Sequence, residues 1–434
     1  MDDKDTQGPF MGERHAIPQQ PGWRRAEVQI FNEVPEALAL VLWQGIRHVR
    51  AWLQTPLPRR AELFHSHPRL SAESRLRDAR AAAPELRAAL DGLLAVTRSP
   101  VTAADRDVGA ACAEIARWAE RNGHAQTAIL FAEAAAVLDG SDPAFANHAG
   151  RLTRNAGEFA RADLWFQRAI GLARGADASV EYTRAQLGYG RLWHTLGDVE
   201  RARKHYNRGS VAAMRQGLEW LAAEAQHDLM AFLTEYGLFE VAEVHARRAL
   251  AWYPKRHHRF PLFVADLVYL FLRRSHFEAA LGLARAAFRT AQHPGQRLVI
   301  AAQYLRAKAG SGDARYLNAS RRRILRTLKT HPDYEIVVRI HLAEASSHAK
   351  LWDAAEEDAR IALDRAIHED DDLPASLARE LLQRIAGRIP PSGNQTRADH
   401  AFTMFVDAVR ERIGNWRPTS TIESRSSVRR GWVA

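Results

Sequence analysis

The chain lacks the features of a secreted or membrane-spanning protein. It contains one cysteine, Cys112, in 434 residues, so no disulfide can form within the chain and a reducing compartment is indicated. No run of about 18 uncharged apolar residues occurs, which argues against a transmembrane helix. The first five residues are acidic and no hydrophobic run follows them, so no secretory signal is predicted. We therefore expect a cytoplasmic protein in which Cys112 is a small core residue.

The chain also lacks the short motifs of common enzymes. It has no Gly-rich phosphate loop, no zincin motif, no nucleophile elbow and no cysteine–histidine metal spacing. The nearest set is His341, Glu344 and His348, three polar residues roughly on one helical face, which could in principle bind a divalent metal. Their position in a repeat favours simple groove-facing polar residues. The sequence therefore predicts no enzyme activity, no cofactor and no metal site.

The net charge is positive, but it is spread over a long chain. The formal net charge is +10, which favours acidic partners, although an arginine-rich composition explains it as well. Two basic runs stand out, at 255–259 and at Arg321, Arg322 and Arg323. The second run is a candidate anion-binding site. Neither run has interleaved aromatic residues that would stack bases, so nucleic acid is not the expected partner.

The ends of the chain differ from its middle. Residues 1–21 and 417–434 have no apolar period and are predicted to be disordered. Residues 22–106 carry helical patterns at 28–52 and 72–96, broken at the Thr55-Pro56-Leu57-Pro58 segment, and form an N-terminal helical cap or a small helical unit. Helical patterns return at 375–389 and 398–413, so 373–416 is predicted to hold C-terminal capping helices.

Between them, residues 107–372 repeat. Ala-rich helical segments alternate with short breaks, and no β-alternation is found. The breaks inside successive helix pairs recur every 34 to 40 residues, at Gly123, Gly157, Gly197, Gly237, Ser275, near Gly312 and at Lys350. Such a period indicates stacked pairs of helices, which bury together what one pair cannot bury alone.

The residues around these breaks resemble tetratricopeptide repeats. Residues 155–169 resemble the second half of such a repeat, with Gly150 seven residues before Gly157. Gly190 and Ala202 continue the pattern in the next unit and are expected to face each other where the helices cross. The sixth unit, 301–328, matches poorly. The resemblance implies an all-α fold, a right-handed α-solenoid of about seven helix pairs with N- and C-terminal capping helices.

The resemblance also implies a binding surface. In tetratricopeptide proteins the first helix of each pair lines a concave groove, and its outward positions bind the partner. Asn and Arg at such positions hold the amides or carboxylates of an extended peptide, although they could equally be solvated polar residues. Carried over by phase, the groove positions are Asn147, Arg151, Arg154, Arg184, Arg191, His194, His227 and Asp228.

Two functions follow as hypotheses. The first is an adaptor or scaffold that binds a protein or peptide, acidic or carboxylate-bearing if the groove arginines hold it. The alternative is a peptide- or ligand-sensing regulatory protein that controls transcription or an enzyme partner. That alternative needs an effector module in residues 22–106, where we find no helix-turn-helix. The sequence indicates neither the identity of the partner nor the oligomeric state.

Overall fold

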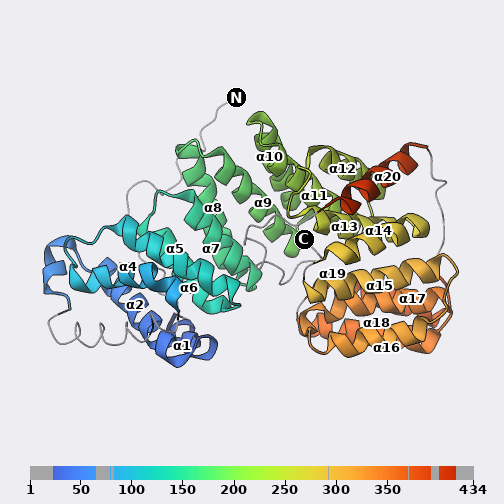
Figure 1. Ribbon diagram of the computed structural model, residues 1–434, viewed down its shortest axis with the longest axis horizontal. Helices are drawn as coiled ribbons and strands as arrows, with labels where there is room; N and C mark the ends of the chain where they lie inside the picture. Colours follow the sequence, from blue (N-terminus) through green and yellow to red (C-terminus); the bar gives the residue numbers. More distant parts are fainter. Residues whose placement is uncertain are drawn as a thin grey trace. The chain divides into compact units, whose positions relative to one another are not determined.

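The computed structural model describes residues 23–64, 79, 83–291, 293–369, 371–391 and 400–416. The segments expected to be disordered, 1–21 and 417–434, lie outside the described residues. Within these ranges the chain is helical, without a strand, which confirms the all-α prediction (Figure 1). None of the described helices is both long and apolar enough to cross a membrane. The helices form two compact units, unit 1 up to Leu192 and unit 2 from Trp193 onward.

In the described residues, unit 1 consists of three N-terminal helices followed by stacked helix pairs. The expected helix at 28–52 is in fact two helices, because Pro35 cannot donate a backbone hydrogen bond and divides it. The expected break at 55–58 is present, since the second helix ends at Gln54. The helices of unit 1 are α1 (Trp23–Glu33), α2 (Glu36–Gln54), α4 (Arg87–Arg98), α5 (Asp105–Arg121), α6 (Ala125–Leu138), α7 (Pro143–Asn155), α8 (Phe159–Gly175) and most of α9 (Ser179–Thr195).

The N-terminal helices are fastened to the first repeat pair. Helices α1 and α2 pack against α6, and α4 packs against α5. The Glu33 carboxylate accepts hydrogen bonds from the backbone N–H groups of Gln126 and Thr127, both at 2.9 Å. These amides begin α6, whose own N-cap residue, His124, makes no side-chain cap bond. Glu33 therefore caps a helix about 90 residues away along the chain.

Unit 2 also consists of stacked helix pairs (Figure 1). Each first helix packs against its own second helix, and the first helices α11, α13, α15 and α17 also contact one another in that order. The helices are α10 (Val199–Arg215), α11 (Glu219–Glu235), α12 (Phe239–Trp252), α13 (Phe260–Arg273), α14 (Phe277–Thr290), α15 (Pro294–Gly310), α16 (Leu317–Leu328), α17 (Glu335–His348), α18 (Trp352–His368), α19 (Asp372–Ala386) and α20 (His400–Gly414).

The turns inside the pairs lie where the repeat period predicts them. Every break named from the sequence has a positive φ, the left-handed conformation that ends a helix and that glycine adopts without strain. Ser275 at φ 58° and Lys350 at φ 57° adopt it without being glycine. The longer spacing in the middle of the array reflects longer helices, because α8, α9, α10 and α11 each have 17 residues whereas α7 has 13.

The last helix does not lie where the sequence led us to expect. Helix α19 packs against α17 and α18 at the end of the array, whereas α20 returns to pack against α13 and α14. There the ring of Phe402 lies 5.1 Å from that of Phe271 and 4.5 Å from that of His276. Arg412 donates hydrogen bonds to the Leu250 and Tyr253 carbonyls at the end of α12. Helix α20 is thus held on α13 and α14 by hydrogen bonds to the free carbonyls at the end of α12 and by contacts with an aromatic surface.

Small residues permit close packing in unit 1, and the closest approach is at Gly188. The pattern in the sequence singled out Gly190, which is also buried in α9. A Cβ added to Gly188 would lie 2.4 Å from Phe166 Cε1, and one added to Gly150 would lie 3.0 Å from Cδ1 of the same ring. The ring of Phe166 therefore packs against backbone on both α7 and α9.

We expect Gly188→Leu to lower the free energy of unfolding by about 1–3 kcal/mol, because the added side chain overpacks the Phe166 ring. The matched control is Gly171→Ala, on the exposed side of α8, where no atom lies within 4 Å of an added Cβ. This control should raise the free energy of unfolding by roughly 0.5–1 kcal/mol through helix propensity. Urea denaturation measures both changes, and equal stability of Gly188→Leu and the natural chain would contradict the packing.

Candidate binding site on the first helices of unit 2

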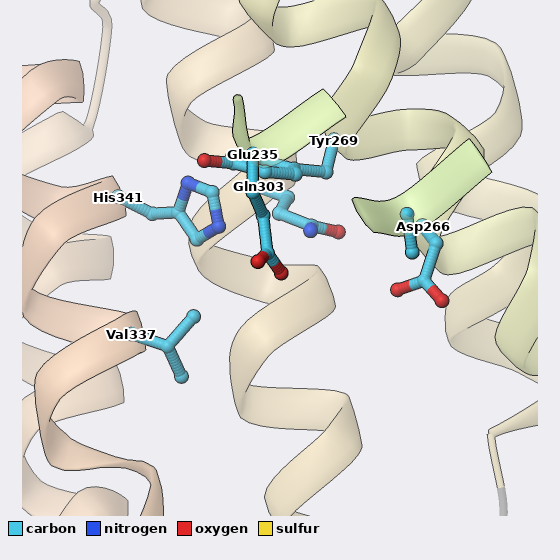
Figure 2. A pocket seen from close by; sticks show the side chains of 7 residues that line it. Glu235, Asp266, Tyr269, Gln303, Val337 and His341 are labelled. Atoms are coloured by element: carbon cyan, nitrogen blue, oxygen red, sulfur yellow. The ribbon is translucent and has the colours of Figure 1, made fainter. Parts of the chain in front are cut away.

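Four successive first helices line one small pocket in unit 2 (Figure 2). Its open volume of about 10 Å³ is close to the space that a single water needs. Because each helix belongs to a different repeat, the pocket exists only through the stacking of the pairs. The lining residues are Ala231 and Glu235 on α11, Asp266 and Tyr269 on α13, Gln303 on α15, and Val337 and His341 on α17.

Two buried carboxylates in this pocket are held by histidines. Glu235 Oε2 lies 2.5 Å from His194 Nε2, and Asp266 Oδ2 lies 2.7 Å from His227 Nε2. The His227 ring is fixed in turn by the Tyr253 hydroxyl, 2.9 Å from Nδ1. The two carboxylate side chains are only 3% and 8% exposed. Each is thus oriented by an imidazole and keeps a second oxygen without a hydrogen-bond donor among the described residues.

Other carboxylates in unit 2 are held differently, by arginine. Asp228 binds Arg259 at 2.7 Å. Glu344 forms ion pairs with Arg306 and Arg384. In the described part of the chain, by contrast, neither Glu235 nor Asp266 has an arginine or lysine within ion-pair distance. The close partners of both pocket carboxylates are therefore imidazoles, and Arg259 acts on Asp266 only from beyond ion-pair distance.

Gln303 is the third polar group of the pocket. Its side chain is 1% exposed, and its buried Oε1 has no hydrogen-bond partner among the described residues. In the close-up view its amide lies between the side chains of Glu235 and Asp266 (Figure 2). A buried acceptor without a donor costs about 1–3 kcal/mol. This cost marks the pocket as a place where a donor is missing.

Burial shifts the protonation of the ionisable groups here. It raises the pKa of the Asp266 carboxyl well above its ordinary value; the Arg259 charge opposes the rise, and Glu235 and Asp228 reinforce it. Burial also lowers the pKa of His341 to about 3, with the charges of Arg306 and Arg273 outweighing Glu344. His341 is consequently neutral at pH 7 and adds no positive charge to the pocket.

The predicted groove residues of unit 1 all lie on first helices, but most are already bound within the protein. Asn147 donates to the backbone oxygen and the carboxylate of Glu181, at 2.9 and 2.8 Å. Arg184 pairs with the same carboxylate at 2.8 Å. Arg151 donates to both carboxylate oxygens of Glu120 through its two terminal nitrogens, Nη1 and Nη2. The remaining two are Arg154, which donates to Asn155 at 2.8 Å, and Arg191, which is half-buried on α9.

The predicted groove residues of unit 2 are inner supports of the pocket. His194 and His227 hold the two pocket carboxylates, as described above. Asp228 is 2% exposed and bound to Arg259, so a partner has little access to it. The positions predicted for unit 2 therefore lie behind the pocket rather than in it.

The structure also shows the surroundings of the anion-binding and metal-binding candidates from the sequence. Arg321 is largely buried against Glu357 and Asp358, at 2.5 and 2.6 Å, so it is not a free anion-binding group, whereas Arg322 and Arg323 are exposed on α16. His341, Glu344 and His348 do not converge, since Glu344 pairs with arginines. His348 packs against the Phe277 ring, at 5.0 Å between ring centres. Within the described ranges no group of three such side chains could hold a metal ion.

Glu235, Asp266, Tyr269 and Gln303 were missed by the sequence analysis. A usable signal existed for Asp266, the one acidic residue in the apolar segment FPLFVADLVYLFLR of α13. A lone carboxylate in such a helix requires a specific partner or a function. Gln303 gave a weaker signal, as an isolated amide within the segment LVIAAQYL.

Comparison with known proteins adds little to this description. No family model matches the chain, and no curated protein matches it. A solved structure titled as the TPR domain of P58(IPK) matches with 13% identity, covering 79% of this chain and 98% of that one. Its TM-score of 0.23 is too low for the superposition to support an argument. The fold rests instead on the paired helices, the left-handed turns and the contacts between first helices, which together show an all-α array of stacked helix pairs similar to tetratricopeptide repeats.

Proposed function

We propose that the chain is a scaffold that binds a protein or peptide segment along the surface of its first helices. The observation that carries this proposal is the pocket of unit 2, where four first helices bring buried polar groups together and leave the Gln303 oxygen without a donor. A folded protein tolerates such a group at a binding site, where a ligand supplies the missing hydrogen bond. An extended segment can do so while its backbone follows neighbouring helices.

The preference for an acidic partner remains a prediction, and fewer arginines now support it. It rested on Arg151, Arg184 and Arg191, and the first two guanidinium groups already bind Glu120 and Glu181. The exposed Arg322 and Arg323 have the stronger claim to an acidic group, because none of the described carboxylates pairs with them. An acidic stretch of the partner would contact α16 by this proposal.

The sensor alternative receives no comparable support. It requires an effector module within residues 22–106. The described helices of that region pack onto α5 and α6, and Glu33 caps α6. These contacts favour a cap that stabilises the first pair, and we therefore keep the scaffold as the proposal.

A steric block of the pocket tests the proposal. We expect Val337→Trp, on the half-buried rim, to weaken binding of the partner by roughly tenfold or more, since the indole fills the space that the segment uses. The full-length chain serves as bait for affinity capture, and the captured partner is then titrated against both forms by calorimetry. The matched control is Val241→Trp on α12, where the valine is 48% exposed and does not line the pocket. Equal affinity of Val337→Trp and the natural chain would exclude this surface.

A further inference from the structure

We infer that the unit 2 pocket receives a lysine side chain of the bound segment, with its ammonium group between the carboxylates of Glu235 and Asp266 and the Gln303 oxygen. This inference rests on the proposed function and adds the chemistry of one recognised residue. Three observations support it: the charge of the pocket, the number and kind of its open acceptors, and its size and walls.

The charge of the pocket calls for a cation. Glu235 and Asp266 are nearly buried, and their close partners are imidazoles, whereas Asp228 and Glu344 bind arginines. A buried carboxylate without a cation is unfavourable, because burial removes its hydration. The raised pKa of Asp266 reflects the same cost, and a positive ligand would remove it. The net charge of +10 at the same time disfavours a strongly basic segment, so a single lysine in a neutral or acidic segment fits best.

The open acceptors match a primary ammonium. Glu235 Oε1, Asp266 Oδ1 and Gln303 Oε1 accept no hydrogen bond from the described residues. Gln303 Oε1 and the ionised carboxylates are acceptors, and a positive ligand favours the ionised form of Asp266. An –NH₃⁺ group carries three donors and no acceptor. An amide or hydroxyl ligand would supply fewer donors and no charge. A carboxylate ligand would be repelled by Glu235.

The size and walls of the pocket select lysine among cations. Its volume of about 10 Å³ accepts a group the size of water, which an ammonium is and a planar guanidinium is not. Ala231, Val337 and the Tyr269 ring provide apolar lining beside the polar groups. A methylene stem packs favourably against such a lining while its charged end reaches the carboxylates. The α-amine of a peptide has no such stem.

A peptide selection tests the inference. Short random peptides with acetylated N-termini and amidated C-termini are passed over the immobilised full-length chain, and the retained peptides are sequenced. We expect lysine to be enriched over arginine, and the enrichment to disappear when the pool's lysines are Nε-acetylated. Glu235→Gln and Gln303→Met, each checked for an unchanged melting temperature, should both reduce the lysine enrichment by roughly tenfold or more. Glu219→Gln, which makes the same charge change at an exposed site on α11, should leave it unchanged.

Each other outcome has a definite meaning. Equal enrichment of arginine and lysine would overturn the inference in favour of a general acidic attraction. A second pool with free N-termini and no lysine, retained by the natural chain and lost with Glu235→Gln, would assign the pocket to an α-amine and likewise overturn it. Peptides retained without any lysine preference would overturn the inference and leave the scaffold proposal standing. Retention of no peptide by the natural chain would count against both.

Discussion

Replacing Asp358 with alanine should lower the free energy of unfolding by about 3–5 kcal/mol. This carboxylate has no exposed surface and joins two arginines from different helices: Oδ2 lies 2.6 Å from Arg321 Nε and Oδ1 lies 2.8 Å from Arg339 Nη1. Removing it takes the buried one of two carboxylate partners from each guanidinium group, since Arg321 keeps Glu357 and Arg339 keeps Glu335. Urea denaturation of the full-length chain, followed by circular dichroism, measures the loss.

Two further variants separate a buried charge from a general effect of mutation. Glu356→Gln on the same helix breaks an exposed pair with Arg360, and its cost should lie between 0 and about 1 kcal/mol. Replacing Asp358, Arg321 and Arg339 together with leucine, methionine and methionine removes all three charges and should recover most of the lost stability. If the triple replacement is no more stable than Asp358→Ala, the loss comes from packing rather than from unpaired charge.

A second large effect is expected on acidification, at Glu120 in unit 1. Burial alone would raise the pKa of this carboxyl, but the hydrogen bonds from Arg151 and His148 outweigh burial and lower it from 4.5 to about 2. A carboxyl whose pKa is lower in the folded chain stabilises the fold at every pH above its unfolded pKa. The contribution, about 3 kcal/mol, is lost as the pH falls from 4.5 to about 2.

Comparing the natural chain with Glu120→Gln isolates that contribution. The free energy of unfolding of the two proteins should differ most above pH 4.5, and the difference should shrink as the pH approaches 2. A constant difference between the natural chain and Glu120→Gln over this range would contradict the lowered pKa.

The same contact changes how Arg151 should be tested. Because Arg151 is among the groove positions expected from the sequence, its replacement by alanine is a direct test of that groove. Arg151 in fact holds the buried Glu120, so its replacement should also lower the free energy of unfolding, by about 1.5–3 kcal/mol. Binding measured with this variant therefore has to be compared at a temperature where the variant is fully folded.

The repeat period predicted the turns because their physical cause is local. A helix ends where a residue takes the left-handed conformation. Gly157 and Gly237 adopt it without strain, and a glycine can be recognised directly in the sequence. Ser275 and Lys350 adopt the same conformation, although serine and lysine seldom do. The repeat period therefore located these turns where the residue type alone would not have indicated them.

The pocket could not be predicted because its cause is not local. Glu235, Asp266 and Gln303 are each more than 30 residues from the next and meet only when three repeats stack. The partner of each charge is chosen by the same stacking: nothing in the sequence indicates that Asp228 binds Arg259 while Asp266 binds His227. The position within the repeat placed Asn147, His194 and His227 on first helices. It could not distinguish side chains that face a ligand from side chains that bind neighbouring residues of the protein.

The return of α20 to α13 and α14 has a consequence for synthesis. About 110 residues separate the end of α14 from the start of α20, so a ribosome adding 5–20 residues per second leaves the surface around Phe271 and His276 uncovered for roughly 5–20 seconds. During that interval the nascent chain exposes aromatic surface of the kind that chaperones bind. Any product of translation that stops before His400 keeps this surface exposed permanently, and such fragments should be cleared rather than accumulate as working repeat arrays.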